Sequence, residues 1–333
     1  MNLESMRSNE VRMAVAALLL LAVVGGAYLV FAEQDTVEIS NAEELQQIRE
    51  DLDGHYVLVD DIDMSGIDNF DPIGYTETPE GAITASDVVR RPFSGEFDGN
   101  GHTISSLMIN RPDEIGVGLF HAVGSEGSIR NVTLKDVNVT GGSGTGGLAG
   151  MHWGTVTETR VTGKVSGGRW YVGGIVGYND NPSSQPGGKI RESYAKVDTK
   201  GNSNVGGVTG LIGRGSVVSK SYAVGNVSGR KNVGGLVGKN LLGKTIESYA
   251  AGRVDGDEDV GGLIGMNSGD VMNSYWDINS TGQSESAGGT GLTTSEMTGS
   301  AARENMEGFD FEETWRTTED DYPRLAWQTE EDE

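Results

Sequence analysis

The chain has 333 residues, of which 52 are glycine and none is cysteine, and its 49 acidic residues outnumber its 25 basic ones. The lack of a Gly-X-Y period excludes collagen despite the glycine content, and the lack of cysteine excludes disulfides and cysteine-ligated metal sites. The formal net charge of −24 argues against nucleic acid as a partner.

The charge is unevenly spread along the chain. Residues 33–126 have a net charge of −17 and residues 269–333 one of −13, whereas residues 127–268 carry +6. The acidic excess suggests an extracellular protein adapted to high salt, although such adaptation should acidify every exposed surface. The basic middle between acidic flanks is therefore unexpected.

Residues 13–32 form an apolar segment without charged side chains, long enough for a helix to span the hydrocarbon core of a membrane. Arg7 and Arg12 precede it, and Glu33 and Asp35 follow it, which predicts that the remainder lies outside the cell. The segment is either a transmembrane anchor behind a cytoplasmic tail of residues 1–12, or a signal peptide cleaved after residue 32. Its length favours the anchor. The protein is expected to be membrane-anchored with an extracellular C-terminal part, or else secreted.

Residues 33–126 are predicted to form the N-terminal cap and the first turns of a repeat domain. The segment 41–49 predicts a short helix with Ser40 or Asn41 as its N-cap and with Leu45, Ile48 and Leu52 on one face. Strands are expected over 56–59, 93–97 and 102–109. Residues 98–101 should form a turn and residues 76–92 an exposed loop.

A short sequence then returns five times, as TGGLAG, VGGIVG, VGGVTG, VGGLVG and VGGLIG. The steps between these units are 27, 33, 28 and 27 residues, and the paired glycines begin at Gly146, Gly173, Gly206, Gly234 and Gly261. Such a period is typical of a solenoid. Residues 127–268 therefore predict an all-β fold, a parallel β-helix with three short strands per turn and rungs about 4.8 Å apart. Residues 269–333 are expected to supply the last turn and a C-terminal cap, with a helix over 294–306.

Stacked turns should also form columns of like residues. Serine and tyrosine ladders are predicted from Ser193-Tyr194, Ser221-Tyr222, Ser248-Tyr249 and Ser274-Tyr275. The glycine pairs are expected where chain segments approach too closely for a side chain, or where φ must be positive. The apolar residue after each pair should point inward.

These units resemble the GLUG-motif repeat proteins. The resemblance rests on the Gly-Gly-Leu-Val-Gly units, the Ser-Tyr-Ala strands, the lead-in segments 61–66, 72–74 and 93–104, and the tail segments 275–277 and 288–294. It covers about residues 37–328 and implies a right-handed parallel β-helix and a role at the surface of a microbe, haloarchaea included. Such repeats also lie beside the catalytic domain of some bacterial IgA-cleaving metallopeptidases. Peptidase activity is not implied here, because no histidine stands in a His-Glu-x-x-His arrangement.

The candidate ligand-binding residues are cationic. Counting back from the valine of the second strand in each turn places Lys164, Lys196, Asn226 and Arg253 in one column. Stacked like charges repel unless they are screened or paired. The column is either a solvated face neutralised by the acidic flanks or by salt, or a stripe that binds an anionic polymer such as an acidic cell-surface glycan.

Carboxylates suggest two other kinds of site. Asp61, Asp63 and Ser65 match the start of a calcium loop, but position twelve is Pro72 and the bidentate glutamate is missing. The alternative is that these residues form polar corners. A glycoside hydrolase would need a facing pair of carboxyl groups, and the ten acidic residues of the repeats do not align into one. Calcium is the one cofactor that the sequence suggests.

Four Asn-x-Ser/Thr sequons are candidate N-glycosylation sites in an exported archaeal or eukaryotic chain, at Asn131, Asn138, Asn226 and Asn279. A glycan on Asn226 would obstruct the cationic column, so the two hypotheses partly exclude each other. The sequence as a whole predicts a non-catalytic surface protein with a structural or adhesive role, whose partner is a cell-surface glycan or an envelope protein. The alternative is a polysaccharide lyase or hydrolase on the same scaffold.

Overall fold

The computed structural model describes residues 23–24, 27–28, 35–74, 91–181 and 187–329. Most of the predicted membrane segment 13–32 and of the predicted loop 76–92 lies outside these ranges. Within segment 13–32, β1 (Val23–Val24) pairs antiparallel with β2 (Ala27–Tyr28). None of the helices in the described ranges is both long and apolar enough to cross a membrane.

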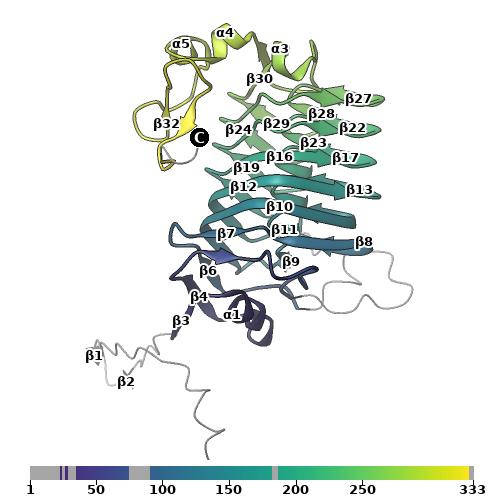
Figure 1. The fold of residues 1–333 in the computed structure, drawn as a ribbon. Coiled ribbons are helices and arrows are strands. Elements are labelled where there is room, and N and C mark those ends of the chain that lie inside the picture. The colour runs from purple at the N-terminus through teal and green to yellow at the C-terminus, as the bar shows by residue number, and fades with distance from the viewer. Residues whose placement is uncertain (1–22, 25–26, 29–34, 75–90, 182–186, 330–333) are drawn as a thin grey trace, which may run out of the picture.

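From β3 onward the chain winds into a coil of stacked parallel strands, so the predicted parallel β-helix architecture is confirmed (Figure 1). One wall is a six-stranded sheet in which equivalent residues of successive turns pair, as Ala149 does with Phe120 and Val176. Its strands are β9 (Phe120–Val123), β11 (Ala149–His152), β14 (Val176–Asn179), β18 (Thr209–Ile212), β23 (Val237–Asn240) and β28 (Ile264–Asn267). Backbone hydrogen bonds run between turns, so each turn is held by its neighbours.

The remaining walls are continuous in the early turns and divided in the later ones. The early turns are formed by β10 (Ser128–Gly146), β12 (Thr155–Gly167), β13 (Trp170–Gly173), β15 (Lys189–Arg191), β16 (Tyr194–Lys200) and β17 (Ser203–Gly206). The later turns contain β19 (Val217–Ser219), β20 (Tyr222–Ala223), β21 (Val227–Ser228), β22 (Lys231–Gly234), β24 (Lys244–Ile246), β25 (Tyr249–Ala250), β26 (Val254–Asp255) and β27 (Glu258–Gly261). A later turn thus has five strands, and the prediction of three was wrong. Corners with positive φ divide it, such as Lys220 (49°) between β19 and β20 and Glu247 (47°) between β24 and β25.

The paired glycines form the corner between β22 and β23 and its equivalents. A Cβ atom on Gly207 would lie 2.3 Å from the carbonyl oxygen of Gly235 in the next turn. None of the paired glycines has a positive φ. Of the two explanations offered by the sequence, close approach is therefore correct, and the positive-φ explanation is wrong for these pairs.

The interior is a single apolar core along the coil. The residue after each glycine pair is fully buried in it, as predicted: Leu148, Ile175, Val208, Leu236 and Leu263. The serine ladder is confirmed and is satisfied across turns. The hydroxyl of Ser221 donates to the carbonyl of Ser219 at 2.8 Å and accepts from the backbone N–H of Ser193 at 3.2 Å. The ladder therefore joins neighbouring turns through buried polar groups that are paired.

The N-terminal end is closed by α1 (Ala42–Gln47) and the 3-10 turn η1 (Ile48–Glu50). Asn41 caps α1 by accepting from two backbone N–H groups, and Leu45, Ile48 and Leu52 are buried, as predicted. Strand β3 (Thr36–Ile39) precedes α1. The strands that follow η1 are β4 (His55–Leu58), β5 (Ile62–Asp63), β6 (Glu96–Asp98), β7 (Thr103–Ser105) and β8 (Met108–Val117).

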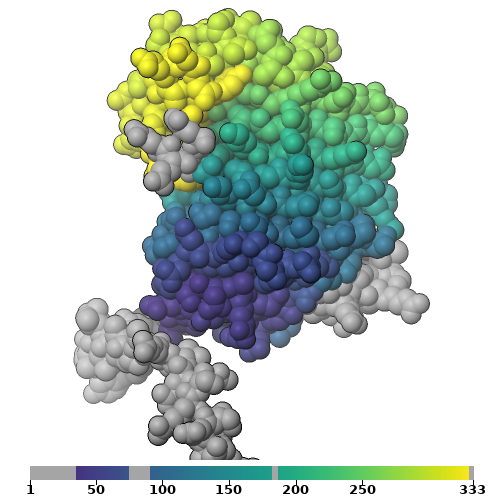
Figure 2. All heavy atoms as spheres, in the orientation of Figure 1, coloured from purple at the N-terminus to yellow at the C-terminus, as the bar shows by residue number. Residues whose placement is uncertain are grey.

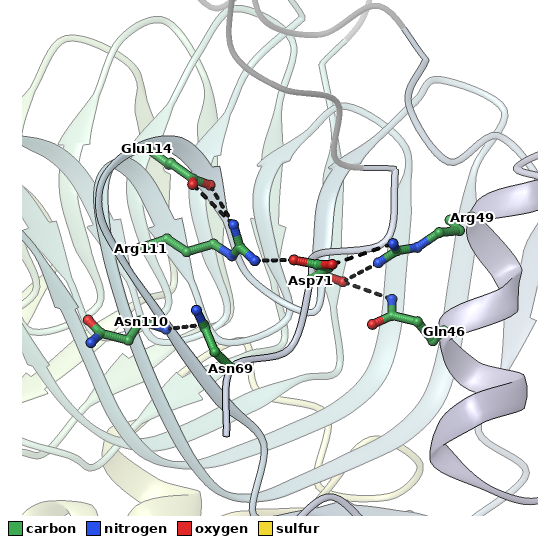
Figure 3. A network of polar contacts seen from close by, with 7 residues as sticks. All are labelled: Gln46, Arg49, Asn69, Asp71, Asn110, Arg111 and Glu114. Carbon is green, nitrogen blue, oxygen red and sulfur yellow. Dashed lines mark hydrogen bonds and ion pairs between the residues drawn. The ribbon is translucent and has the colours of Figure 1, made fainter. Parts of the chain in front are cut away.

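A polar network fastens this cap to the coil (Figure 3). Asp71 lies at its centre, with its carboxylate paired to Arg111 of β8 and lying 3.5 Å from Arg49. Gln46 of α1 donates to the backbone carbonyl of Asp71 at 3.0 Å. Arg111 also contacts Glu114 at 3.1 Å. The network therefore connects the capping helix, through Asp71, to the first long strand.

The C-terminal part closes the other end and also covers one side. The last turn contains β29 (Asp270–Met272), β30 (Tyr275–Asp277) and β31 (Thr290–Leu292), with α3 (Ile278–Thr281), α4 (Thr294–Met297) and α5 (Ala301–Asn305). The single helix predicted over 294–306 was wrong, because Gly299 adopts φ 60° between two short helices. Residues 306–329, here called the C-terminal strap, fold back along the coil (Figures 1 and 2). The strap contains the antiparallel pair β32 (Trp315–Arg316) and β33 (Arg324–Leu325).

The strap lies on the tyrosine ladder and forms a second apolar cluster with it. The rings of Tyr194, Tyr222 and Tyr249 stack with centroids 4.8 Å apart, which confirms the predicted ladder. Trp315 lies against two of these rings, and the hydroxyl of Tyr249 donates to the carbonyl of Pro323 at 2.7 Å. The tyrosines therefore point away from the main core and are buried by the C-terminal strap.

Candidate binding surface

The predicted cationic column is interrupted. Strand register aligns Lys164 with Asp198, and it aligns Lys196 with Thr162 instead. Asp198 is followed in the next turns by Asn226 and Arg253, since Thr199, Val227 and Val254 align. The placement of Lys196 in this column was therefore wrong.

The cause of this error is a buried threonine. The prediction took Val197 as the inward residue of its turn, whereas Thr199 occupies the position equivalent to Val165 and Val227. Thr199 is 1% exposed, and its hydroxyl donates to the carbonyl of Val197. Threonine has the branched shape of valine and can replace it inside a β wall when its hydroxyl is paired.

The true column mixes charges. Asn226 donates to the carboxylate of Asp198 at 2.9 Å, and Arg253 lies 3.6 Å from Asp255. Both members of the second pair are about 70% exposed, so the pair adds little to stability. Whether Lys164, Lys196 or Arg253 binds a ligand stays a prediction.

Beside this column the structure contains a shallow groove of about 390 Å³ that runs along several turns of the coil, here called the axial groove. Its lining comes from equivalent corners of successive turns: Pro112, Thr140, Gly141, Ser166, Gly167, Gly168, Lys200, Gly201, Asn202 and Arg230. None of these described lining residues carries a carboxyl group. The groove therefore repeats a small, uncharged or basic corner from turn to turn.

The floor of the axial groove is glycine because valine side chains lie directly beneath it. A Cβ atom on Gly167 would lie 2.3 Å from a methyl of Val172, and one on Gly201 would lie 2.7 Å from the same residue. A side chain at either position would point into the core, so packing requires glycine here. No side chain protrudes from this corner, where Gly167 is buried and Gly201 half-buried.

The rim of the axial groove is basic. Arg169 follows Gly168 in the chain and is exposed, as are Lys200 and Arg230. Among the described residues, no carboxylate pairs with Arg169 or Lys200, whereas Arg230 lies 3.4 Å from Glu258. Exposed cations therefore border the groove, and others such as Lys189, Lys196 and Lys244 are exposed elsewhere on the coil.

The C-terminal end of the rim is neutralised. Lys231 donates to Glu258 at 2.9 Å, and this hydrogen bond raises the pKa of the lysine and lowers that of the glutamate. Asp255, Asp257 and Asp259 surround the same corner and are exposed. The favourable surface for an anion therefore ends at about Arg230.

An exposed aromatic residue stands two positions after the lining residue Gly168 in the chain. Trp170 begins β13 and is 53% exposed, the largest exposed fraction among the large hydrophobic side chains of the described residues. In the register of the coil it aligns with Ser203 and then Lys231. A bare indole beside cationic side chains is a feature that hydrophobic burial does not explain.

Sequence reasoning missed the axial groove, although a signal was present. A second set of glycines recurs in the same rhythm as the paired ones, at Gly141, Gly167, Gly201, Gly229 and Gly256. Each precedes the next glycine pair by a few residues, as Gly141 precedes Thr145-Gly146-Gly147. Trp170, Lys200 and Arg230 stand next to this column and could have been recognised from it.

The calcium candidates are engaged within the protein. Asp63 accepts from the backbone and the hydroxyl of Ser65, each at 2.9 Å, and these bonds lower its pKa. Asp61 accepts from the backbone of Thr103 at 2.9 Å in the adjacent turn. The described part of the chain holds no group of three or more His, Asp or Glu residues arranged to hold a metal ion.

Three of the four sequon asparagines are exposed on the coil: Asn138, Asn226 and Asn279. Asn131 is half-buried and occupies a corner with φ 54°. The amide of Asn226 is bound to Asp198, and the side-chain oxygen of Asn279 accepts from the backbone of Thr294. Glycosylation at these positions stays a prediction.

Groups that could perform acid–base chemistry do not gather in the groove. Burial raises the pKa of Glu158, with a further contribution from Glu192, and burial also raises that of Asp180. Glu158 and Asp180 belong to different walls of the coil, whereas Glu192 lies near Glu158 in the next turn. His121 and His152 are buried, which lowers the pKa of each to about 4, so both are neutral near pH 7.

The chain is similar to three characterised or solved proteins. It is 37% identical to halomucin of Haloquadratum walsbyi over 250 residues, which are 71% of this chain and 3% of halomucin. It is 34% identical over 110 residues to a provisionally named Gly-rich membrane protein of Evansella cellulosilytica, covering 32% of this chain and 12% of the relative. A crystal structure from Bacteroides ovatus, provisionally named an immunoglobulin A1 protease, superposes with a TM-score of 0.66 at 19% identity, over 90% and 94% of the two chains.

These comparisons differ in what they show. No protein-family model matches the chain. At 19% identity the likeness to the Bacteroides structure concerns the fold alone. The chain spans only a small part of each of the two curated relatives. It is thus similar to a stretch of halomucin and shares a coiled β fold with the Bacteroides protein.

Proposed function

We propose that this is a non-catalytic cell-surface protein in which the β-coil has a structural or adhesive role and binds anionic glycans. The likeness to halomucin and to a Gly-rich membrane protein supports a place at the cell surface. Attachment to the membrane would use residues 13–32 if they are not cleaved. Envelope proteins are the second class of partner.

The observation that carries this proposal is the axial groove. It is lined by glycine, serine, threonine and asparagine, with Lys200 and Arg230 as its charged residues. An extended polymer can lie in such a channel, and a negative polymer is favoured because exposed cations form its rim. A channel whose lining has two cations and no carboxylate is suited to an anionic partner, although the protein as a whole is acidic.

A carbohydrate-active enzyme on the same scaffold is the second candidate. The raised pKa of Glu158 beside Glu192 is the observation in its favour, because a general acid needs a carboxyl group of this kind. Incubation with acidic and neutral polysaccharides, followed by assays for reducing ends and for unsaturated products, tests it. Product formation that Glu158→Gln abolishes would replace the non-catalytic proposal.

Several finer features belong to the same proposal. We infer a right-handed coil, since parallel strands joined by a crossover within one sheet almost always turn that way. Membership of the GLUG-motif repeats rests on the repeat units of the sequence, and life at high salt rests on its acidic excess. Calcium at Asp61, Asp63 and Ser65 would require these carboxylates to exchange their present partners.

The experiment is a glycan-array screen of the full-length protein, purified in a mild detergent, at low and at high salt. We expect acidic glycans to be retained and neutral ones to be washed off, with weaker retention as salt screens the charges. Binding that is restricted to neutral glycans, or none to any glycan, would contradict the proposal.

A further inference from the structure

We infer that the axial groove is a binding site for a linear polysaccharide of carboxylated sugars, lying along the coil with about one sugar for each turn. This inference rests on the proposed function and deepens it by naming the site and the class of ligand.

The repeat of the groove suits a chain of sugars. Equivalent corners of the coil follow each other at about 4.8 Å, the spacing of paired β-strands. The stacked rings of the tyrosine ladder have the same centroid spacing, 4.8 Å, which shows how regular the turns are. A pyranose in an extended chain advances by a similar length. Each sugar would therefore meet the same backbone and small polar groups as the one before it.

The floor of the axial groove suits a flat sugar ring better than a branched group of a ligand. Gly141 and Gly167 are buried in the lining and Gly201 is half-buried, so no side chain protrudes from the floor at these positions. Thr140, Ser166 and Asn202 stand along its sides with hydroxyl and amide groups, which can donate to and accept from sugar hydroxyls. A sugar ring could thus approach the backbone closely and form hydrogen bonds on both edges.

The basic rim of the axial groove favours sugars that carry a carboxylate. Lys200 and Arg230 line the groove, and Arg169 is next to the lining residue Gly168. A guanidinium group binds a carboxylate through two hydrogen bonds, so Arg169 matches a uronate better than a neutral sugar. Arg230 donates to Asn202 and Glu258 and would exchange these partners for the carboxylate of the sugar. The exposed face of Trp170 can stack on the C–H face of a sugar in the same stretch.

The length of the bound segment is limited by charge. Beyond Arg230 the same corner carries Asp255, Asp257 and Glu258, which repel carboxylates. At the other end Pro112 closes the lining. The groove therefore accepts a segment of about four or five sugars, with a step of about 4.8 Å per turn. Affinity should rise with chain length up to that size and then level off.

Calorimetric titration of the full-length protein in mild detergent tests the inference, with oligogalacturonides from dimer to hexamer as the probe. Malto-oligosaccharides serve as the neutral comparison and a short polyphosphate as a second anion. The variants are Trp170→Ala and the double variant Lys200→Ser with Arg230→Ser. The control is Lys189→Ser with Lys244→Ser, which removes the same charge from exposed residues on another wall. Circular dichroism establishes that each variant is folded.

We expect the tetramer to bind, the double groove variant to lose at least about tenfold in affinity, and the control to lose much less. In high salt the charge contribution shrinks, so Trp170→Ala should then cause the larger relative loss. Lys200→Arg with the native Arg230 should bind the tetramer as the unaltered protein does, because the positive charge is kept.

Contrary outcomes separate the two proposals. Uronide binding that survives the groove variants but is lost with Lys164→Ser and Arg253→Ser would overturn the groove while leaving the glycan proposal intact. Binding of polyphosphate but not of uronides would make the ligand another anionic polymer. Failure of all acidic saccharides would overturn both proposals.

Discussion

Glycine is the residue that most directly determines how the turns stack. In the fifth repeat unit the second glycine, Gly262, faces the ring of Trp276. In the other four, the second of the paired glycines faces the carbonyl oxygen of its counterpart one turn away, at 2.2 Å to 2.7 Å from where a Cβ would stand. The contact is with backbone, which cannot rotate away as a side chain would. These positions are therefore defined by distance between chain segments.

Replacement of Gly207 by alanine should destabilise the coil. The added methyl would lie 2.3 Å from the carbonyl oxygen of Gly235 and 2.5 Å from the Cβ of Ala223, so the turns must separate. We expect the free energy of unfolding in guanidinium chloride to fall by about 1–3 kcal/mol or more, the usual cost of overpacking. Gly66→Ala is the control, because no atom lies within 4 Å of its added methyl. Equal effects of the two substitutions would contradict the packing argument.

At the scale of elements, the C-terminal strap is the part that repeats do not explain. It brings Phe309, Trp315 and Trp327 onto tyrosines that a bare coil would expose. Trp327 also donates to the carbonyl of Glu192 at 2.9 Å. Local composition indicated a cap at the end of the solenoid, but a side contact of this kind depends on residues more than a hundred positions apart and has no periodic signal.

Deletion of residues 306–333 should expose the tyrosine ladder. Burial is the main cause that raises the pKa of Tyr249 well above 10, with nearby Tyr222 and Asp321 adding to it. Without the strap the hydroxyl should titrate closer to 10, seen as tyrosinate absorbance at a lower pH. Tyr178 packs in a different cluster and should titrate unchanged. An unaltered titration curve in the folded truncated protein would show that the strap does not bury the ladder.

At the scale of the whole molecule, the acidic flanks repel themselves. Residues 33–126 carry −17 and residues 269–333 carry −13, so each flank concentrates negative charge. Raising KCl from about 0.1 M to 1 M shortens the screening length from about 10 Å to 3 Å. Self-repulsion in the folded state should fall accordingly.

The thermal midpoint should therefore rise with KCl, by about 2–4 °C for each kcal/mol of repulsion removed. Most of the rise should occur below about 0.5 M, where screening changes fastest. A midpoint that is constant or falls with salt would contradict this account. A rise that continues linearly to high salt would point to exclusion of the salt from the protein surface instead.

The coil architecture could be predicted from sequence because its cause is repeated. The glycine pairs, the Ser-Tyr units and the apolar residue after each pair recur in every turn, and the structure places each as a column. The number of strands could not be predicted, because corners with positive φ at residues such as Lys220 and Glu247 carry no glycine signal. The register of one turn was wrong because Thr199 takes the place of a valine.

The binding surface was predicted only in outline. The net positive charge of residues 127–268 indicated where an anion would bind, and Lys164 and Arg253 do share a column. The axial groove itself depends on the position of valines beneath glycines, as with Val172 under Gly167. This contact joins two strands of one turn, and it can be recognised only when the angle at the corner between the two strands is known.

The C-terminal strap also has a mechanical consequence. It contacts residues of four successive turns, through Glu192, Tyr222, Tyr249 and Tyr275. A plain solenoid pulled from its end can peel one turn at a time, since each turn holds only its neighbours. Here the C-terminal strap binds four turns at once. A force applied to the C-terminus is therefore shared by these turns as a shear load. The protein would resist traction at that end as one block and yield in a single step.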